Sequence, residues 1–567
     1  MIPTSVTSFN QLFTGDQLGV YFMLSVFNAV ILFLSSMKFI LVLQQCGYRG
    51  KRYFKWLSNK DTPYLSRLML LCLLAFLFFG MLNICFAPLI TTIAKNDVLG
   101  ESIASYVGLS SYLLFSGLYI KTESSVNAKV PLKKTKRLIR LCITFIILLA
   151  VISFGVITLL NYLAFVIKNE VFALLRLAFI CVMPILLPYI LFLAYAINEP
   201  LESIIRKHYI RIAERKLNES NVLKIGITGS YAKTSVKEIL RTILSQKYRV
   251  LSTPESYNTP LGIALTTKNL DNTYDIFIAE MGARSKGDIK ELAEIVKPKI
   301  GVLTGVNNQH LESFKNIEVI KQTKNELFES LTDEGIGFFS SDNENSIELF
   351  NNFTKEKYLA GIDGENNLVT AKDLKVNEKG MSFNLEFEGE KSVKCSTVLL
   401  GRHNVKNICL ASAVAYKIGL SPKEIASGIN RIKSIQHRLE LIPNNKKIVL
   451  IDDSYNSNVD GVNAAMEVLD SFKGRKIVLT PGLVELGKVE NVVNMELGRT
   501  LSKHADIVIV IGKHNAEMII NGLIDSGFKR QNIKFAPTLT KGNKILNEML
   551  SEGDVVLFEN DLPDNYS

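Results

Sequence analysis

Residues that could bind nucleotide phosphates stand between an apolar run and a predicted helix. Residues 221–238, NVLKIGITGSYAKTSVKE, pass from a predicted strand through a turn to a lysine, two hydroxyl side chains and a helix start. Successive backbone N–H groups and a helix N-terminus attract anions. We expect Lys233 to reach the outer phosphates and Thr234 to ligate magnesium. The predicted loop comprises Gly229, Ser230, Tyr231, Ala232, Lys233, Thr234 and Ser235.

Ala232 departs from the usual pattern of such a loop, in which a glycine precedes the lysine. If this position requires a positive φ, alanine costs about 1 kcal/mol or more. The stretch taken alone therefore leaves two interpretations open. It could be a working phosphate loop, or it could be a strand–helix turn without a ligand.

Further motifs follow downstream in a fixed order. They are ESYNTPLGIALTT (255–267), IFIAEMGARSKGDI (276–289), TGVNNQHLESF (304–314), VIKQTKNELF (319–328), GRHNVKN (401–407), HRLELI (437–442), LIDDSYNSNVDG (450–461) and LVELGK (483–488). Each is weak alone, but together, over roughly 221–558, they resemble the Mur ligase family. The resemblance is closest to the branch that adds D-alanyl-D-alanine to the UDP-N-acetylmuramoyl tripeptide.

The resemblance implies a magnesium site and a modified lysine. Glu280 matches an acidic ligand that shares magnesium with Thr234, and His310 matches the ligand of a second magnesium. Lys324 matches a lysine that is carbamylated in the family. A carbamate would offer oxygens suited to magnesium, whereas an ammonium would be repelled by it. Outside this series, each residue could equally be an ordinary loop, strand-end or helix-surface side chain.

The resemblance also assigns nucleotide and substrate contacts. Asn407 matches an adenine-side asparagine, and Arg438 and Asp453 match residues that grip phosphate and ribose when the domains close. Their expected neighbours at the nucleotide are Tyr455 and Asn456, and the expected substrate-side residues are Asn258 and Thr259.

The implied reaction is ATP-dependent amide formation through an acyl phosphate, with ATP and two magnesium ions as cofactors. Three alternatives stay open. The chain could be an amino-acid polymerase resembling the poly-γ-glutamate synthetase, an ATP-driven export component, or an inactive ligase-like scaffold.

Three departures from the resembling ligases bear on the substrate. The domain that grips the UDP-sugar has no counterpart, and an apolar region precedes the ligase motifs. TPG (480–482) replaces an aspartate-containing turn, and the acidic end DVVLFENDLPDNYS replaces a basic segment. We therefore expect a lipid-linked or membrane-associated envelope or capsule precursor and an amino-acid or other amine substrate. The acidic residues Glu559, Asp561 and Asp564 are expected to face a cationic group on the substrate, to shield a contact with a partner protein, or to form a solvated terminus.

Short β-rich runs alternate with helical stretches after residue 220, which is typical of parallel α/β domains. Apolar–polar alternation within 363–398 predicts antiparallel strands appended to the first of these domains. A second α/β unit is expected to begin near 438. The predicted organisation is a membrane domain (1–198), an amphipathic stalk (199–220), a central P-loop ATPase domain (221–436) and a Rossmann-like C-terminal domain (437–567).

Five charge-free runs lie in the first 200 residues, and each is long enough to cross a membrane. They are 17–37, 68–94, 102–120, 141–167 and 177–198. Lys and Arg are absent from 1–16 but number six in 45–67, one in 95–101, seven in 121–140 and two in 168–176. The positive-inside rule then predicts a multi-pass bacterial plasma-membrane protein with its N-terminus outside and its ligase domains in the cytoplasm.

The net charge of +11 originates in this apolar half, where 17 Lys and Arg face 7 Asp and Glu within residues 1–200. We therefore expect membrane lipid and no nucleic acid as a partner. Partner proteins are not readable from the sequence. The seven cysteines show no metal-like or paired spacing.

Overall fold

The computed structural model describes most of the chain in two compact units, Met1–Ile205 and Arg206–Ser567. The described residues are 15–58, 132–167, 171–254, 257–307, 316–364, 366–377, 380–434, 438–442, 447–454, 459–484 and 489–560, with isolated positions at 70, 72–74, 77, 92, 117, 314 and 486.

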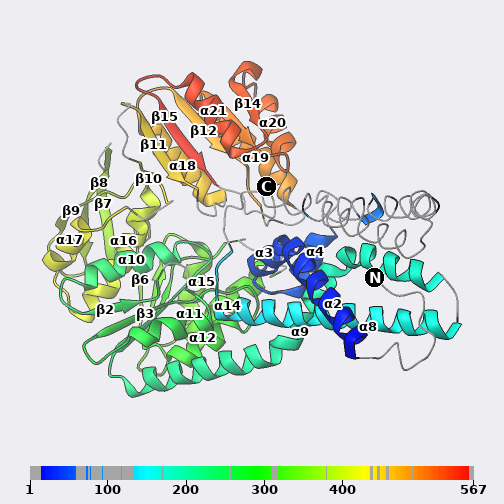
Figure 1. Cartoon of the computed structure of the whole chain (residues 1–567). Coiled ribbons are helices and arrows are strands. Elements are labelled where there is room, and N and C mark those ends of the chain that lie inside the picture. Colours follow the sequence, from blue (N-terminus) through cyan, green and yellow to red (C-terminus); the bar gives the residue numbers. More distant parts are fainter. Residues whose placement is uncertain are drawn as a thin grey trace. The chain divides into compact units, whose positions relative to one another are not determined.

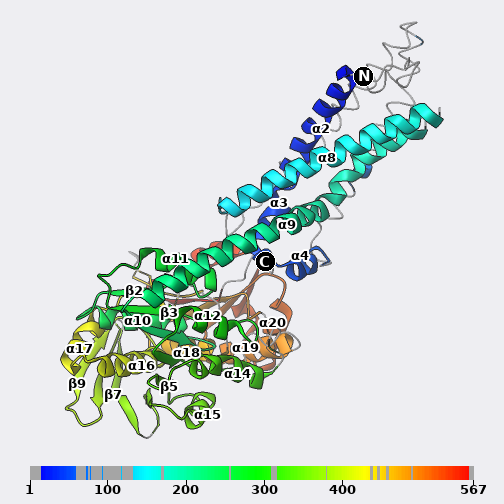
Figure 2. The ribbon, with the colours of Figure 1, turned by 90° about the horizontal axis from the view of Figure 1, so that it is seen from below.

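The first unit is helical. The helices among its described residues are α2 (Gly15–Ser35), α3 (Met37–Gln45), α4 (Gly50–Leu57), α8 (Lys136–Ile167) and the first part of α9 (Val171–Glu219). α2 and α8 lie side by side (Figure 2). A core that includes Phe39, Tyr53, Phe145 and Leu187 joins α3, α4, α8 and α9. The opposite face of α8 stays apolar, because Ile139, Ile143, Ile147 and Val151 recur every four residues and are more than half exposed.

Two helices of the described residues are long and apolar enough to cross a membrane, Lys136–Leu163 and Val182–Glu219. There are three if the pair Tyr21–Ser35 and Met37–Gln45, bent by 51°, counts as one span. These helices overlap most of the predicted runs 17–37, 141–167 and 177–198. The runs 68–94 and 102–120 lie outside the described residues except for a few isolated positions, so a total of five spans stays a prediction.

The second unit contains a nine-stranded sheet in the order β2-β3-β1-β4-β5-β6-β7-β8-β9. Figure 1 labels β2, β3, β6, β7, β8 and β9 of this sheet. Neighbouring strands are parallel from β2 to β7 and antiparallel from β7 to β9, as the alternation within 363–398 predicted. The strands are β1 (Leu223–Thr228), β2 (Val250–Ser252), β3 (Ile276–Glu280), β4 (Ile300–Leu303), β5 (Ile336–Ser340), β6 (Lys357–Gly361), β7 (Asn367–Asn377), β8 (Gly380–Phe387) and β9 (Val393–Thr397).

Helices cover both faces of this sheet. One face packs on α10 (Lys233–Leu244), α16 (Arg402–Ile418) and α17 (Pro422–Asn430). The other face packs on α11 (Pro260–Thr266), α12 (Asp288–Val296), α14 (Ile317–Glu329) and α15 (Glu344–Asn352), with η2 (Thr267–Asn269) following α11. Because parallel strands end at one edge, the loops after β1, β3, β4, β5 and β6 meet there.

A six-stranded sheet follows in the order β10-β11-β15-β12-β13-β14. Its strands are β10 (Glu440–Leu441), β11 (Val449–Asp453), β12 (Lys476–Thr480), β13 (Ile507–Ile511), β14 (Ile533–Ala536) and β15 (Val555–Glu559). α18 (Val459–Asp470), α19 (Glu490–His504) and α20 (Ala516–Asp525) cover one face, and α21 (Leu539–Met549) covers the other, with η4 (Arg530–Asn532) before β14. The prediction of α/β domains is confirmed.

Candidate active site

The phosphate loop connects the end of β1 at Thr228 to the start of α10 at Lys233. Gly229 has a φ of 151°, and a Cβ at this position would lie 2.0 Å from the Thr304 hydroxyl. The Ser230 N–H donates to the Gly305 carbonyl at 2.8 Å. The loop is therefore pressed against the turn after β4, and only glycine fits at its first position.

Ala232 occupies the left-handed region, with φ 59° and ψ 2°. It is the N-cap residue of α10, and its carbonyl accepts the Val236 N–H at 2.8 Å. The loop therefore does require a positive φ where alanine stands, at a cost of about 1 kcal/mol. The surrounding contacts hold this conformation, because Tyr231 packs so closely over Gly305 that a Cβ there would lie 2.2 Å from the Tyr231 hydroxyl.

Lys233 curls back over its own loop. Its ammonium donates to the carbonyl oxygens of Gly229 at 2.8 Å and Ser230 at 3.2 Å. Burial lowers the pKa of Lys233, while the negative charge of Glu280 opposes that shift. The loop, a lysine and a carboxylate therefore lie together at the sheet edge. Ser235, the last residue of the predicted loop, is buried in the first turn of α10.

Glu280 and Thr234 lie together as the sequence predicted. Glu280 ends β3 and is 1% exposed, and its Oε2 accepts a 3.0 Å hydrogen bond from the Thr234 hydroxyl. Its Oε1 accepts from the Asn258 side-chain amide at 3.3 Å. The ammonium of Lys237, which the sequence analysis did not single out, lies 3.3 Å from Oε2.

The pair of Thr234 and Glu280 fits magnesium in the way that phosphate-binding sites use it. Mg²⁺ takes one or two carboxylate or hydroxyl oxygens from protein and completes its shell with water and phosphate oxygens. Among the described residues, no group of three His, Cys, Asp or Glu side chains could hold a metal ion. His310, the predicted ligand of a second ion, lies outside the described residues.

Lys324 is buried in α14, with 3% of its surface exposed. Burial and the positive charge of Lys233 lower the pKa of Lys324 to about 7, while Asp288 and Glu326 oppose the shift. A large fraction of this amine is therefore neutral near pH 7, and a neutral amine is the form that reacts with carbon dioxide. Glu326 is engaged elsewhere, because its carboxylate accepts the N–H groups of Gly287 at 2.7 Å and Lys290 at 3.0 Å.

The two predicted substrate-side residues have structural contacts. The Thr259 hydroxyl caps α11 by accepting the Gly262 N–H at 3.3 Å. Asn258 is tied to the loop after β3, because its carbonyl accepts the Gly282 N–H at 3.1 Å and its side chain contacts Glu280. Asn258 thus adjoins the predicted magnesium ligand, while Thr259 acts as a helix cap.

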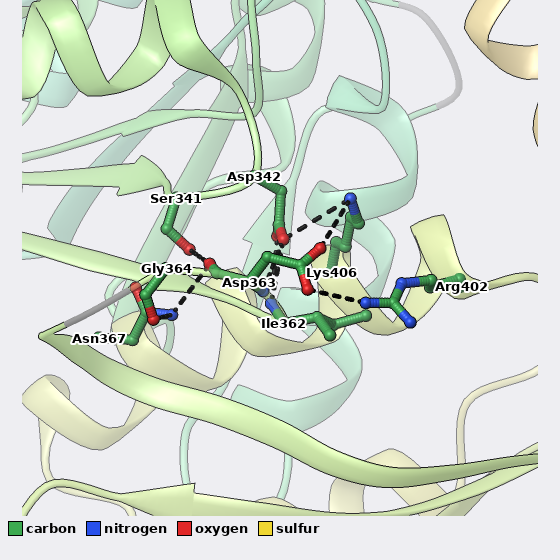
Figure 3. Close-up of polar contacts among 8 residues, drawn as sticks. All are labelled: Ser341, Asp342, Ile362, Asp363, Gly364, Asn367, Arg402 and Lys406. Carbon is green, nitrogen blue, oxygen red and sulfur yellow. Dashed lines mark hydrogen bonds and ion pairs between the residues drawn. The ribbon is translucent and has the colours of Figure 1, made fainter.

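Asn407 lies buried on the second turn of α16 and donates to the Asn404 side chain at 3.5 Å. His403 lies one turn before Asn407 on α16, and its pKa is lowered to about 4. Burial is the largest cause, and the positive charges of Arg438 and Lys406 add to it. The start of α16 is fixed by an ionic cluster (Figure 3). Arg402 contacts Asp363 at 2.8 Å, and Lys406 contacts Asp342 at 3.6 Å.

The centre of that cluster is Asp342, whose side chain is 3% exposed and accepts the N–H groups of Ile362 at 3.2 Å and Asp363 at 2.9 Å (Figure 3). Burial raises the pKa of Asp342, although Lys406 and these N–H groups oppose the shift. Asp342 therefore joins the loops after β5 and β6 to α16, the helix that carries Asn407. None of the residues in this cluster was singled out from the sequence.

Arg438 and Asp453 lie close together at the start of the second sheet. The Asp453 carboxylate, at the end of β11, accepts the Leu439 N–H at 3.2 Å. Burial raises the pKa of Asp453 to about 6, although Arg438 and that N–H oppose the shift. The structure thus brings these two predicted nucleotide contacts together. Tyr455 and Asn456 lie outside the described residues.

The carboxyl edge of the second sheet also contains a cavity of about 360 Å³. Its lining is mainly apolar and includes three polar residues, with no lysine or arginine among the described ones: Ile442, Leu450, Asp452, Ser454, Leu479, Pro481, Ile511, Leu539, Phe558 and Asn560. The expected acidic terminus needs a correction here. Glu559 is the last residue of β15, beside Asp453, and is 0% exposed, so it belongs to the sheet rather than to a solvated tail. Asp561 and Asp564 lie outside the described residues.

Comparison with known proteins identifies both α/β domains. Residues 227–415 match the family model of the Mur ligase middle domain, and residues 437–559 match that of the Mur ligase glutamate ligase domain. UDP-N-acetylmuramoyl-tripeptide–D-alanyl-D-alanine ligase of Bacillus subtilis is 27% identical over 354 residues, which are 62% of this chain and 75% of the relative. The corresponding Escherichia coli enzyme is 29% identical over 293 residues, or 51% of this chain and 65% of the relative.

Solved structures agree with these matches. MurF of Thermotoga maritima in complex with ADP has a TM-score of 0.57 at 26% identity, covering 63% of this chain and 80% of that one. MurF of Acinetobacter baumannii has the same fold, with a TM-score of 0.57 at 23% identity over 63% of this chain and 77% of that one. With its phosphate loop, paired sheets and ordered motifs, this chain belongs to the Mur ligase family of ATP-dependent acid–amino-acid ligases.

Proposed function

We propose that this protein is a membrane-anchored ligase that activates a carboxylate with ATP and joins it to an amine. The observation that carries the proposal is the 3.0 Å contact of Thr234 with the buried Glu280 beside the phosphate loop and Lys233. Such a constellation can hold a nucleotide phosphate, a divalent cation and a positive charge at one point. The fold places it at the carboxyl edge of a parallel sheet, where ligands bind in such folds.

The reaction transfers the γ-phosphoryl group of ATP to a carboxylate oxygen, giving an acyl phosphate and ADP. The amine nitrogen then attacks the acyl carbon, the bond to the phosphate oxygen breaks, and an amide, phosphate and a proton are released. In this scheme the backbone N–H groups of the loop bind the phosphates, and the Lys233 ammonium leaves the Gly229 and Ser230 carbonyls to meet the charge on the transferred group.

Thr234 and Glu280 would hold one magnesium ion. When bound, the metal neutralises the phosphate charge and favours in-line transfer. We further propose that Lys324 carries a carbamate that contributes to a second cation site together with His310. The supporting observations are the burial of Lys324 and its pKa of about 7, which leaves much of the amine neutral.

The C-terminal domain would hold the other end of the nucleotide. Arg438 and Asp453 lie together at its first strands, which supports the assignment of phosphate and ribose contacts to this pair. In the central domain, we assign the adenine side to Asn407, which is buried on the second turn of α16 beside Lys406. Closure of the two domains would exclude water, which would otherwise hydrolyse the acyl phosphate.

The proposed membrane anchor consists of the apolar helices of the first unit. The exposed apolar face of α8 is suited to contact with lipid. Near the first residues of α8, both α8 and α9 carry charged side chains. There Arg137 pairs with Glu199 at 2.9 Å, and Arg140 pairs with Glu202 at 2.6 Å. α9 continues from its apolar part to Glu219, just before β1. We propose five spans, an outside N-terminus and ligase domains in the cytoplasm of a bacterial cell.

A lipid-linked or membrane-associated cell-envelope or capsule precursor is the proposed carboxylate substrate, because the catalytic unit would stay at the membrane surface. The relatives are named for joining D-alanyl-D-alanine to a UDP-N-acetylmuramoyl tripeptide. For the present ligase we propose an amino acid or another amine as the second substrate.

The test supplies purified full-length protein with ATP, Mg²⁺ and bacterial membranes, and adds amino acids or D-alanyl-D-alanine in separate reactions. We expect amine-dependent ADP release and an amide-linked product in the lipid fraction, identified by mass spectrometry. A Lys233→Ala variant serves as the control and should give neither. ATP hydrolysis that is unaffected by any amine, with no amide formed, would contradict the ligase proposal.

A further inference from the structure

Lys237 is a buried lysine next to the predicted magnesium ligand. Its side chain is 0% exposed, and its ammonium lies 3.3 Å from Oε2 of Glu280, whose side chain is 2% exposed. It also lies 3.5 Å from Oε1 of Glu238, on the adjacent position of α10. A lysine is almost never fully buried unless it is paired, so this ion pair accounts for its position.

Lys237 and Lys233 have different environments although they stand four residues apart on α10. That spacing places both on one side of the helix. Lys233, at the first residue of α10, reaches the carbonyls of the phosphate loop. Lys237, one turn further along, lies beneath the loop against β3, where it is closed off from solvent and contacts the carboxylate. Its location therefore fits an action on Glu280 and not on a nucleotide.

Oε2 of Glu280 is the atom that both the Lys237 ammonium and a magnesium ion would contact. This oxygen already accepts a hydrogen bond from the Thr234 hydroxyl at 3.0 Å, and the Lys237 ammonium lies 3.3 Å from it. A magnesium ion between Thr234 and Glu280 would bind the same oxygen. Like charges that share one carboxylate in a buried site repel each other strongly, because little water screens them.

We propose that Lys237 is a built-in counter-ion for Glu280. It orients the buried carboxylate and balances its charge when no metal is bound, and by its like charge it weakens magnesium binding. The apparent magnesium affinity of the site is therefore set by Lys237 as well as by the ligands. This inference rests on the proposed function, because it takes Thr234 and Glu280 as the magnesium ligands.

The experiment measures magnesium binding without turnover. Full-length protein in detergent is titrated with Mg²⁺ at pH 8 in the presence of the β,γ-imido analogue of ATP, and binding and unfolding temperature are recorded. For Lys237→Met we expect a lower unfolding temperature without metal, because Glu280 loses its partner. We also expect about tenfold tighter Mg²⁺ binding and a larger magnesium-induced rise in unfolding temperature than in the wild type.

Two further variants distinguish the effect of the Lys237 charge from that of its hydrogen bonding. They also keep the test valid if Lys237→Met fails to fold. Lys237→Gln retains a donor without the charge and should respond to Mg²⁺ as the methionine variant does. Lys237→Arg retains the charge and should restore the wild-type response.

Lys321 offers a matched control in the same domain. It is 8% exposed and is paired with Glu318 and Glu348, each at 2.8 Å, neither of which is a predicted metal ligand. Lys321→Met should lower the unfolding temperature while leaving the Mg²⁺ response at the wild-type value. A response of the Lys237 variants that is equal to or weaker than that of the wild type would overturn the counter-ion role. A wild-type protein that shows no response to Mg²⁺ with the ATP analogue would instead contradict the proposed function.

Discussion

The Thr234 hydroxyl donates a 3.0 Å hydrogen bond to the Glu280 carboxylate, joining the first turn of α10 to the end of β3. Glu280→Gln would keep the shape of this contact but remove its charge. We expect turnover to fall by about a hundredfold or more, since charge stabilisation in transfer is worth several kcal/mol. The ligase unit should also lose up to about 3 kcal/mol of unfolding free energy, because the buried Lys237 ammonium loses Glu280 and keeps only the more distant Glu238 as a charged partner. Steady-state kinetics and urea unfolding measure both effects. Wild-type turnover in this variant would remove Glu280 from the site.

Ala232 holds a left-handed conformation that glycine adopts without strain. Ala232→Gly should therefore raise the unfolding free energy by about 0.5 to 1 kcal/mol, the left-handed strain being partly offset by the greater entropy of the unfolded chain. ATP affinity should rise or stay constant. As a control, Ala413→Gly in the interior of α16 should cost about 1 kcal/mol. A destabilised Ala232→Gly variant would show that packing of the alanine methyl outweighs the backbone strain.

The sequence located the phosphate loop and the strand that ends in Glu280 because these parts are local. A strand, a glycine turn and a helix occur within residues 221–238, and periodicity places the strand that ends in Glu280. The left-handed position of Ala232 also followed from a local motif. Lys237 had a local signal, its four-residue spacing from Lys233, but the same spacing would suit a solvent-facing lysine.

The other omissions depend on tertiary contacts. Asp342 stands in a polar stretch after β5, and only the folded chain shows it buried under the loop after β6 with Lys406 of α16. Glu559 was grouped with Asp561 because acidic residues usually mark a solvated terminus. The strand that contains it is central in the second sheet, so pairing with β11 and β12 buries its last residue.

Lys324 gives a test by chemical rescue. Lys324→Ala should lose most turnover, because neither an amine nor a carbamate then remains at the site. Bicarbonate or a short carboxylic acid should partly restore it by supplying carboxylate oxygens. The control Lys233→Ala should not be rescued, since its ammonium acts directly on phosphate. Full activity of Lys324→Ala would exclude the carbamate role.

Asp453 gives a pH-dependent prediction. Its folded pKa is about 6, whereas an unfolded aspartate titrates near 3.9. Between these values the folded state binds more protons, so this group lowers stability as pH rises from about 4 to 6. Asp453→Asn removes that penalty and should raise the unfolding free energy by about 3 kcal/mol above pH 6, with no difference below pH 4. Urea unfolding across this range measures it. ATP affinity should fall in the same variant if Asp453 contacts the ribose. In that case the buried carboxylate lowers stability but is needed for nucleotide binding.

The last prediction concerns membrane topology. Reporter fusions or single-cysteine labelling at positions 8, 55, 97, 130 and 210 should report outside, inside, outside, inside and inside. The reason is that basic residues concentrate in 45–67 and 121–140, whereas 1–16 contains none. Positions 55 and 210 lie on α4 and α9 and must agree if four spans separate them. A reporter at 210 that faces outside would separate the ligase unit from cytoplasmic ATP. That result would contradict both the anchor and the proposed reaction, whereas an odd result at 97 alone would change only the number of spans.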